Sequence, residues 1–243
     1  LGLINSCKGG KRIRGVLVRL GYEIATGPSD PRNDVVRVGV AFEILHAALL
    51  IHDDIMDKSV TRRGKPSLYQ ALGGDHYGIS QAINIGDISL YLPIKIIAES
   101  ALLGEQKIRA LSHLSQTIIN TGWGQIIDIE VTQGKKKALE DDIKFININK
   151  TARYTIAGPL QIGAILGGAN EELIRGFGEF GESLGIAFQI KDDILDGELD
   201  EDSLSEAADY AKKAKKIIPQ ITADVKMKKL LEDMTEFMVE RKK

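Results

Sequence analysis

The sequence predicts an all-α bundle, and three observations lead to that prediction. Apolar residues recur at three- and four-residue steps along most of the chain, as they do in helices with one buried face. Residues that favour helix starts, such as Asn170 and the Asp30-Pro31 pair, precede several of these stretches. No run shows the alternation of a strand, and no low-complexity linker divides the chain. We therefore expect one domain, residues 1–243, made of packed helices.

The expected helices can be placed in order. The first covers residues 10–26, and the second runs from Asp30-Pro31 to about Asp57 as a long, largely buried helix. Its buried face is predicted from the apolar stripe Val35, Val38, Phe42, Leu45, Leu49 and Met56. Further helices are expected over residues 77–99 with a kink at Pro93, 105–133, 139–157, 159–166, 170–196, 203–218 and 222–241.

The helix expected over residues 170–196 carries glycines at positions 176, 178, 181 and 185. A glycine inside a helix costs about 1 kcal/mol relative to alanine. Four of them predict either a close approach of another helix or the wall of a ligand site.

Composition excludes several functions. With 43% hydrophobic and 27% charged residues, the chain has the composition of a soluble globular protein. Its 32 basic and 34 acidic residues give a net charge of -2, so no overall field attracts nucleic acid or an anionic membrane. Cys7 is the only cysteine, which excludes an internal disulfide and a thiolate metal cluster. No uninterrupted apolar run reaches the roughly 20 residues of a membrane-spanning helix, so we expect a cytoplasmic protein without a membrane span or a nucleic-acid partner.

The segment IHDDIMDKSVTRRG, residues 51–64, places three aspartates at the end of the second helix. Asp53 and Asp57 are one turn apart on one face, with side chains about 5 to 6 Å apart, and Asp54 is rotated from them. Like charges at this spacing destabilise a helix, so a cation must offset them. Oxygen ligands without a nearby cysteine suit Mg2+ better than Zn2+. For one such triplet alone, a solvated acidic helix end is the simpler interpretation.

A second acidic triplet favours the metal site over the solvated helix end. The segment FQIKDDILDG repeats the spacing at Asp192, Asp193 and Asp196, again at the end of a helix that is apolar upstream. Two identical triplets are hard to explain as two unrelated surface patches. If the two helices face each other, the carboxylates form a cage for several Mg2+ ions, which is useful when an anion such as diphosphate fills it.

Basic residues that could bind a diphosphate are also present. The segment CKGGKRIRG sets Lys8, Lys11, Arg12 and Arg14 around Gly9-Gly10 at a helix start, where free N–H groups and the helix dipole favour anions. Arg62-Arg63 follow the first triplet directly. For Lys8 or Arg12 taken singly, a solvated basic surface is the simpler interpretation.

The segments GGKRIR, LLIHDDIMDKSVTRRGKPS, GQIIDIE, NKTARYTIAGP and FQIKDDILD occur in this order. This combination resembles the trans-isoprenyl diphosphate synthases, the family of farnesyl and geranylgeranyl diphosphate synthases. The resemblance covers nearly all of residues 9–196 and is weaker over the final helices. The motifs are highly specific as a set, whereas each one alone is not. The resemblance implies an isoprenoid-synthase bundle around a deep central cavity, usually as a homodimer.

The resemblance also implies roles for individual residues. Two to three Mg2+ ions would be held by Asp53, Asp57 and Asp192, with Asp54, Asp193 and Asp196 as outer or lesser partners. Isopentenyl diphosphate would be bound by Lys11, Arg14, His46 and Arg63. The allylic diphosphate would be bound by Arg62, Lys150, Thr151 and Gln189. The catalytic residues would be Asp53, Asp57, Asp192 and Lys150.

The implied reaction is a condensation. Mg2+ and basic residues assist ionisation of the allylic diphosphate to a carbocation, which the double bond of isopentenyl diphosphate attacks. A proton is then lost, in the family to the released diphosphate. No side-chain base is needed, and we identify no credible Ser-His-Asp or Cys-His arrangement.

Residues just before the first triplet predict the product length. Ala48 and Leu49 lie one turn deeper than Asp53, where shorter-chain members of the family usually carry aromatic rings as a floor. Ala48 leaves this floor open, so we expect a product of C20 or longer. Residues such as Leu45 or Phe42, together with the facing helix over residues 83–90, would set the stop. A farnesyl-length (C15) synthase is the alternative.

Two histidines receive different interpretations. His46 lies about two turns before Asp53 on nearly the same face, which together with the family match favours contact with the cavity. His52 is interpreted as structural.

Five further positions are assigned to packing or left open. Gly86-Asp87 and Trp123 are expected to serve packing and helix ends. Gln125 and Asp128, one turn apart, could orient metal-bound water or the first triplet.

The chain departs from the family pattern after DDILD. The family usually continues through a long segment with a Gly-Lys pair, an Asp and a second lysine, whereas here Gly197-Glu198 leads almost directly into LDEDSLSEAADYAKKAKK. We expect that a flexible lid near residues 197–199 and part of the N-terminus are missing, with a truncated relative as the alternative.

Three rival functions explain less. A terpene cyclase usually carries a different second metal motif, and a non-catalytic partner subunit usually loses aspartates. An HD-type phosphohydrolase, read from His46 and His52-Asp53, would leave Asp192 to Asp196 unexplained.

Overall fold

The computed structural model describes residues 7, 10–27, 33–197 and 199–240. Sequence predictions also fell on Lys8, Gly9, Asp30, Pro31, Glu198 and Arg241, which lie outside the described residues. Among the described residues, the regular secondary structure is helical apart from one short hairpin, so the all-α prediction is confirmed. It divides into two compact units, residues 1–16 with 32–102 and residues 17–31 with 103–243. The expected single domain stays a prediction.

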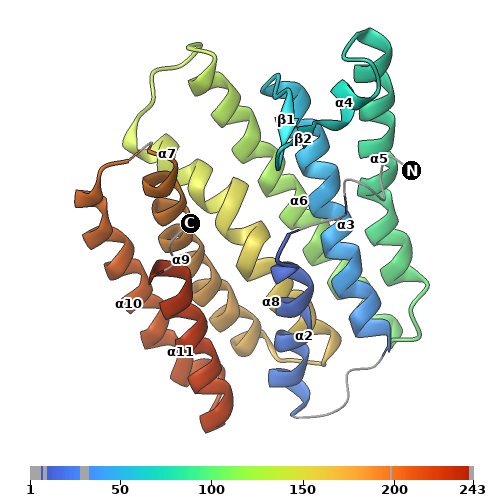
Figure 1. Ribbon diagram of the computed structural model, residues 1–243. Helices are drawn as coiled ribbons and strands as arrows, with labels where there is room; N and C mark the ends of the chain where they lie inside the picture. Colours follow the sequence, from blue (N-terminus) through green and yellow to red (C-terminus); the bar gives the residue numbers. More distant parts are fainter. Residues whose placement is uncertain (1–6, 8–9, 28–32, 198, 241–243) are drawn as a thin grey trace. The chain divides into compact units, whose positions relative to one another are not determined.

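The first unit is built on two long helices (Figure 1). Helix α3 (Asn33–Met56) packs along α5 (His76–Ala98), whose first turn is capped by Asp75: its carboxylate accepts a hydrogen bond from the Gly78 N–H at 3.0 Å. Between these helices the chain forms strands β1 (Thr61–Arg62) and β2 (Lys65–Pro66), then the short helix α4 (Leu68–Ala71).

The hairpin was not predicted from the sequence. Arg62 pairs with Lys65, and the intervening Arg63 and Gly64 have φ values of 53° and 71°. Positive φ at both central residues is typical of the type I′ turn, whose twist matches that of the flanking strands. Strands of two residues are too short to show alternation, which explains why the sequence pattern did not reveal them.

The predicted buried face of α3 is largely confirmed. Val35, Val38, Phe42 and Leu45 are each exposed by 1% or less. Met56 is 44% exposed, so its assignment to that face was wrong: it ends α3 and is followed by the exposed residues Asp57 and Lys58.

The start of helix α2 (Ile13–Thr26) also packs on α3 within the first unit. A Cβ on Gly39 would lie 2.9 Å from the carbonyl oxygen of Gly15, so only glycine permits this approach. The Gly15 N–H donates to Oε1 of Glu43 at 3.0 Å, which satisfies a donor of the first helical turn.

The second unit holds the rest of α2 and a run of helices in which α9 packs against η1 and α10. These are α6 (Gly104–Thr132), α7 (Glu140–Ile146), the π-helix η1 (Asn147–Ala157), α8 (Gly158–Leu166), α9 (Glu171–Asp196), the 3-10 helix η2 (Glu201–Ser203), α10 (Leu204–Ile221) and α11 (Val225–Glu240). The predicted cap is confirmed: the Asn170 side chain accepts from the Leu173 N–H at 3.0 Å. Phe177, Phe180 and Leu184 of α9 are fully buried.

Two helix predictions in this unit need correction. Residues 139–157 are not one α-helix, because an α-helix ending at Ile146 continues as the π-helix η1, and apolar spacing does not distinguish the two. Helix α10 does not end at Ile218 but passes Pro219 to Ile221. The burial of Ile218 and Ile221 offsets the hydrogen bond that proline removes.

Two of the glycines of α9 lie where another helix approaches closely. A Cβ on Gly181 would lie 2.4 Å from the Cα of Ala157, and one on Gly185 would lie 2.4 Å from the Cα of Ala152. The predicted close approach of another helix is therefore confirmed at these two positions, and the partner is η1. At Gly176 the nearest atom would be 3.5 Å away, on Ile221, so glycine is not required there.

Among the described helices, α3 is the one that is long and apolar enough to cross a membrane by length and composition. Half of its most apolar window is buried, and the core helix of a soluble protein meets the same two criteria. The expected absence of a membrane span stays a prediction.

Candidate functional site

The first acidic triplet lies where α3 ends. Asp53 and Asp54 belong to its last turn, and the Asp57 N–H donates to the Asp53 carbonyl at 2.9 Å, which extends the helical path to Asp57. Asp54 is only 4% exposed, whereas Asp57 is exposed. The three carboxylates therefore have different environments although they share one motif.

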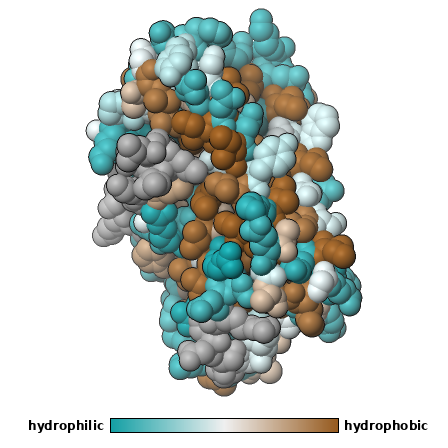
Figure 2. All heavy atoms as spheres, turned by 90° about the vertical axis from the view of Figure 1, so that its right-hand side faces the viewer, coloured by the Kyte–Doolittle hydropathy of each residue, from teal (hydrophilic) through white to brown (hydrophobic). Residues whose placement is uncertain are grey.

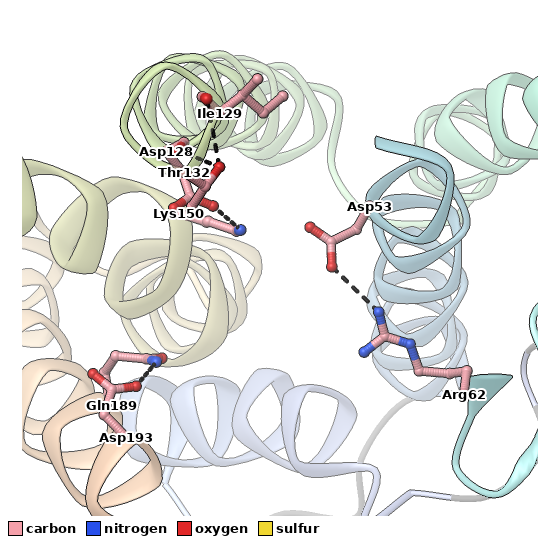
Figure 3. A network of polar contacts seen from close by, with 8 residues as sticks. All are labelled: Asp53, Arg62, Asp128, Ile129, Thr132, Lys150, Gln189 and Asp193. Carbon is pink, nitrogen blue, oxygen red and sulfur yellow. Dashed lines mark hydrogen bonds and ion pairs between the residues drawn. The ribbon is translucent and has the colours of Figure 1, made fainter. Parts of the chain in front are cut away.

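Arg62 of β1 contacts the carboxylates of Asp53 and Asp54, and Figure 3 shows its contact with Asp53. Its Nε donates to Oδ1 of Asp54 at 2.8 Å, and its Nη2 lies 2.6 Å from the same oxygen and 3.3 Å from Oδ2 of Asp53. Burial raises the pKa of Asp54, and the hydrogen bond and charge of Arg62 offset this rise only in part. Part of the positive charge that the acidic triplet requires is thus supplied by the hairpin.

A basic group surrounds His46 on α3. Burial, together with the positive charges of Arg14, Arg63, Arg62 and Arg12, lowers the pKa of His46 to about 2. The imidazole is therefore neutral at physiological pH and carries one donor and one acceptor nitrogen. The structure thus brings His46 close to arginines that the sequence had assigned to diphosphate binding.

The backbone near these arginines is strained. Arg12, Lys58 and Arg63 have φ values of 53°, 55° and 53°, in the left-handed region that non-glycine residues occupy at a cost of about 1 to 3 kcal/mol. A Cβ on Gly10 would lie 3.2 Å from Nη2 of Arg63, so this backbone runs against the guanidinium. Arg12 is exposed, in agreement with its interpretation as part of a solvated basic surface. Its Nη1 lies 3.7 Å from Oε2 of Glu43.

The second acidic triplet lies in the last turns of α9. Asp192 and Asp193 are half-buried, and Asp196 is the exposed last residue. Gly197 ends the helix in the left-handed conformation, with φ 81°. Nε2 of Gln189 donates to Oδ1 of Asp193 at 2.6 Å, one turn away, as Figure 3 shows.

In the same unit Lys150 pairs with Asp128, a contact that the sequence did not predict. Nζ of Lys150, on η1, lies 2.5 Å from Oδ2 of Asp128 on α6 (Figure 3). A Cβ on Gly124 would lie 2.6 Å from the backbone N of Lys150, so glycine lets η1 approach α6. Gly124 lies one turn before Asp128 on the same face, and this spacing is the sequence signal that could have indicated the pair.

The carboxylates could serve as metal ligands. Among the described residues, no three His, Cys, Asp or Glu side chains converge as a preformed metal centre. The cage expected between the two triplets and the deep cavity stay predictions.

The fold and both motifs agree with comparisons to known proteins. A family model described as polyprenyl synthetase matches residues 3–239. Geranylgeranyl diphosphate synthase of Sulfolobus acidocaldarius is 32% identical over 198 residues, which cover 81% of this chain and 57% of that protein. Geranylfarnesyl diphosphate synthase of Methanosarcina mazei is 35% identical over 188 residues, which cover 77% of this chain and 58% of that protein. The chain belongs to the polyprenyl synthetase family, and it spans little more than half the length of these relatives.

Solved structures of similar fold include a geranylgeranyl pyrophosphate synthase from Corynebacterium glutamicum, complexed with isoprenyl diphosphate and magnesium. Its TM-score is 0.89 at 22% identity, and the match covers 99% of this chain and 90% of that chain. A geranylgeranyl pyrophosphate synthetase from Pyrococcus horikoshii has a TM-score of 0.80 at 26% identity, with 99% and 90% covered. At 22% identity the first likeness shows the fold alone.

Proposed function

We propose that the protein is a prenyltransferase that condenses isopentenyl diphosphate with an allylic diphosphate to give a trans-polyprenyl diphosphate of C20 or longer. The observation that carries this proposal is the pair of identical acidic triplets, each at the end of a long helix with a buried face, in a chain of the polyprenyl synthetase family. The names of the relatives, geranylgeranyl and geranylfarnesyl diphosphate synthases, support the reaction and the product range.

Two to three Mg2+ ions would be held by Asp53, Asp57 and Asp192, with Asp54, Asp193 and Asp196 as outer partners. The donor set fits, since carboxylates offer oxygen ligands, and Mg2+ usually takes one or two carboxylates while water and substrate phosphate fill its other positions. Three converging protein ligands are therefore not required. When bound, the metal supplies Lewis-acid stabilisation of the charge on the departing diphosphate.

The basic residues have the chemistry to bind two diphosphates. Lys11, Arg14 and Arg63 would bind isopentenyl diphosphate, together with His46, which can donate a hydrogen bond without adding charge. Arg62, Lys150, Thr151 and Gln189 would bind the allylic diphosphate. Because Arg62 and Lys150 are paired with carboxylates in the structure, each would exchange a carboxylate oxygen for a phosphate oxygen.

The reaction balances without a side-chain base. The C–O bond of the allylic diphosphate breaks, and its electron pair leaves with the diphosphate. The double bond of isopentenyl diphosphate attacks the allylic cation, and the proton lost afterwards goes to the released diphosphate. The residues of this chain hold both substrates in line, and Lys150 stabilises the departing charge.

Product length would be set on α3. Ala48 is fully buried, and Leu49 beside it is half-buried. We expect that Ala48→Phe, which adds an aromatic ring at this depth, shortens the product by at least one C5 unit, as sizing of the products would show. Leu50→Phe, on a different face of the same turn, is the matched control. An unchanged product length in Ala48→Phe would contradict the role of Ala48.

We further propose a cytoplasmic homodimer without a membrane span or a nucleic-acid partner. In the first unit, α5 exposes Ile88 by 59% and Tyr91 by 70%. Figure 2 looks onto the side where α5 lies and shows apolar side chains at the surface. In the second unit, α6 exposes Ile119 by 52% and Trp123 by 57%. Such faces favour burial against a second chain, which sedimentation would reveal as twice the monomer mass.

The family match over residues 3–239 supports one polyprenyl synthase domain. The lid segment expected near residues 197–199 stays a prediction.

The test is incubation with Mg2+, labelled isopentenyl diphosphate and a C5, C10, C15 or C20 primer, followed by sizing of the products. A product of C20 or longer supports the proposal, and a product that stops at C15 supports the farnesyl-length alternative. A cyclised hydrocarbon would identify a terpene cyclase. No product with any primer would identify a non-catalytic partner subunit.

A further inference from the structure

A histidine that the sequence assigns only to structure fits into a notch on α5. A Cβ built on Gly86 would lie 2.2 Å from Nε2 and 2.6 Å from Cδ2 of His52. The imidazole of α3 therefore occupies the space that any other residue at position 86 would need for its own side chain. Gly86 itself is buried, so the ring covers the backbone at this position.

The same ring has polar neighbours on α5. Nε2 of His52 lies 3.4 Å from the Ile83 carbonyl oxygen and 3.5 Å from Oδ1 of Asp87. Both neighbours are acceptors, which favours the tautomer with the proton on Nε2. Both distances are longer than those of strong hydrogen bonds, so the fit of the ring in the notch is the main restraint. Only 19% of the His52 side chain is exposed.

The notch lies directly beside the first acidic triplet, because His52 immediately precedes Asp53. The apolar cluster of Ile51, Tyr69 and Ala82 continues the contact of α3 with α4 and α5 on this side. Rotation of the end of α3 about its axis would pull the imidazole out of the notch. Since successive side chains on a helix differ by about 100°, such a rotation would also turn the Asp53 carboxylate away from its direction.

We propose that His52 is a positioning residue for Asp53 and Asp57. Gly86 provides the space that its imidazole occupies, and Asp87 provides a polar contact to the ring. This inference rests on the proposed function, in which these two aspartates hold Mg2+. His52 acts through the orientation of the end of α3. Removal of groups that orient metal ligands typically costs about 10- to 100-fold in metal affinity or activity.

The experiment compares His52→Ala, Gly86→Ala and the double variant with wild type. The imidazole is the far end of a rotatable side chain, so Gly86→Ala can fold with the ring turned out of the notch. In the double variant, the new methyl group on residue 86 fills part of the space that the ring leaves. His76→Ala, which removes an exposed histidine at the start of the same α5, is the matched control.

Two quantities are measured: the Mg2+ concentration for half-maximal turnover, and the rise in thermal unfolding temperature on adding Mg2+ with inorganic diphosphate. We expect both single variants to need about tenfold more Mg2+ and to show a smaller rise. The double variant should regain unfolding temperature relative to His52→Ala but keep the raised Mg2+ requirement. The control should match wild type.

In the turnover measurement, single variants with the Mg2+ requirement of wild type would overturn the inference. A double variant that recovers both quantities would also overturn it, because it would show packing alone. Absence of turnover in wild type would reject the proposed function. The rise in thermal unfolding temperature would then test the positioning role of His52 separately. A smaller rise in the single variants than in wild type would still support positioning. An equal rise in all variants, or none in wild type, would reject it.

Discussion

The two acidic triplets share one spacing but differ in what supports them. Asp54 in the first is buried and hydrogen-bonded to Arg62, a cation supplied by the following hairpin. Asp193 in the second is half-buried and receives a hydrogen bond from the neutral amide of Gln189. The helix beneath the second is held by close packing on η1, which Gly185 permits. The comparison teaches that one aspartate spacing can have different local support: an arginine contact at Asp54, and an amide contact on a closely packed helix at Asp193.

The largest expected effect tests what the triplets share. Asp53→Asn and Asp192→Asn should each lower turnover about 10^3-fold, equivalent to about 4 kcal/mol, because each removes a charge that would hold the metal. Steady-state kinetics at saturating substrate and Mg2+ would measure this. Asp209→Asn, at an exposed position on α10, is the control and should keep wild-type turnover. If either variant kept a tenth of the activity, that triplet would not be part of the catalytic machinery.

The next effect tests the packing that supports the second triplet. Gly185→Ala should lower the free energy of unfolding by about 3 kcal/mol, because the added methyl group would lie 2.4 Å from the Ala152 backbone, which cannot move aside easily. Gly176→Ala meets only ordinary contact and should change stability by less than about 1 kcal/mol, towards greater stability. Urea unfolding would compare them. Equal effects would show that the contact between α9 and η1 is not tight.

These contacts also show what the sequence could and could not predict. Helix positions followed from apolar spacing and from caps such as Asn170, because these signals are local. The hairpin was missed because its strands are too short to show a pattern, and the π-helix because its spacing resembles that of an α-helix. Pairs such as Lys150 with Asp128 join residues far apart in sequence, so single-chain patterns do not specify them. Glycines at positions 86 and 124 were the available hints, since each marks a close approach.

The contact of Arg62 with Asp54 can be compared with that of Gln189 with Asp193. Arg62→Met leaves the buried Asp54 carboxylate without this partner and should lower the free energy of unfolding by about 2 kcal/mol, a value reduced by the 37% exposure of the arginine side chain. Gln189→Leu, the equivalent change at the second triplet, should cost less than about 1 kcal/mol. Urea unfolding at pH 7 measures both.

A double variant separates charge from packing at this contact. Adding Asp54→Asn to Arg62→Met removes the buried charge and should recover most of the lost stability, since the cost comes from an uncompensated carboxylate. A double variant no more stable than Arg62→Met would show that the arginine acts mainly through its packing.

The last effect concerns pH; it vanishes at neutral pH and again differs between the units. The pKa of His46 is lowered to about 2 in the folded protein, below the usual value of about 6.5. Above pH 6.5 this costs no stability. Below pH 6.5 this histidine is protonated in the unfolded chain but stays neutral in the folded protein. The free energy of unfolding therefore decreases as the pH is lowered, by up to about 1.4 kcal/mol per pH unit. His46→Gln should remove this part of the slope between pH 6 and 4.5.

His113 in the second unit provides the matched comparison. Burial also lowers its pKa, but the hydrogen bond with Gln161 and the charge of Glu171 oppose the shift. His113→Gln should therefore flatten the pH dependence less than His46→Gln does. Urea unfolding at half-unit pH steps would rank the two variants. An equal slope for His46→Gln and wild type would mean that the arginines and burial around His46 do not keep it neutral, and the basic group of the first unit would then need a different description.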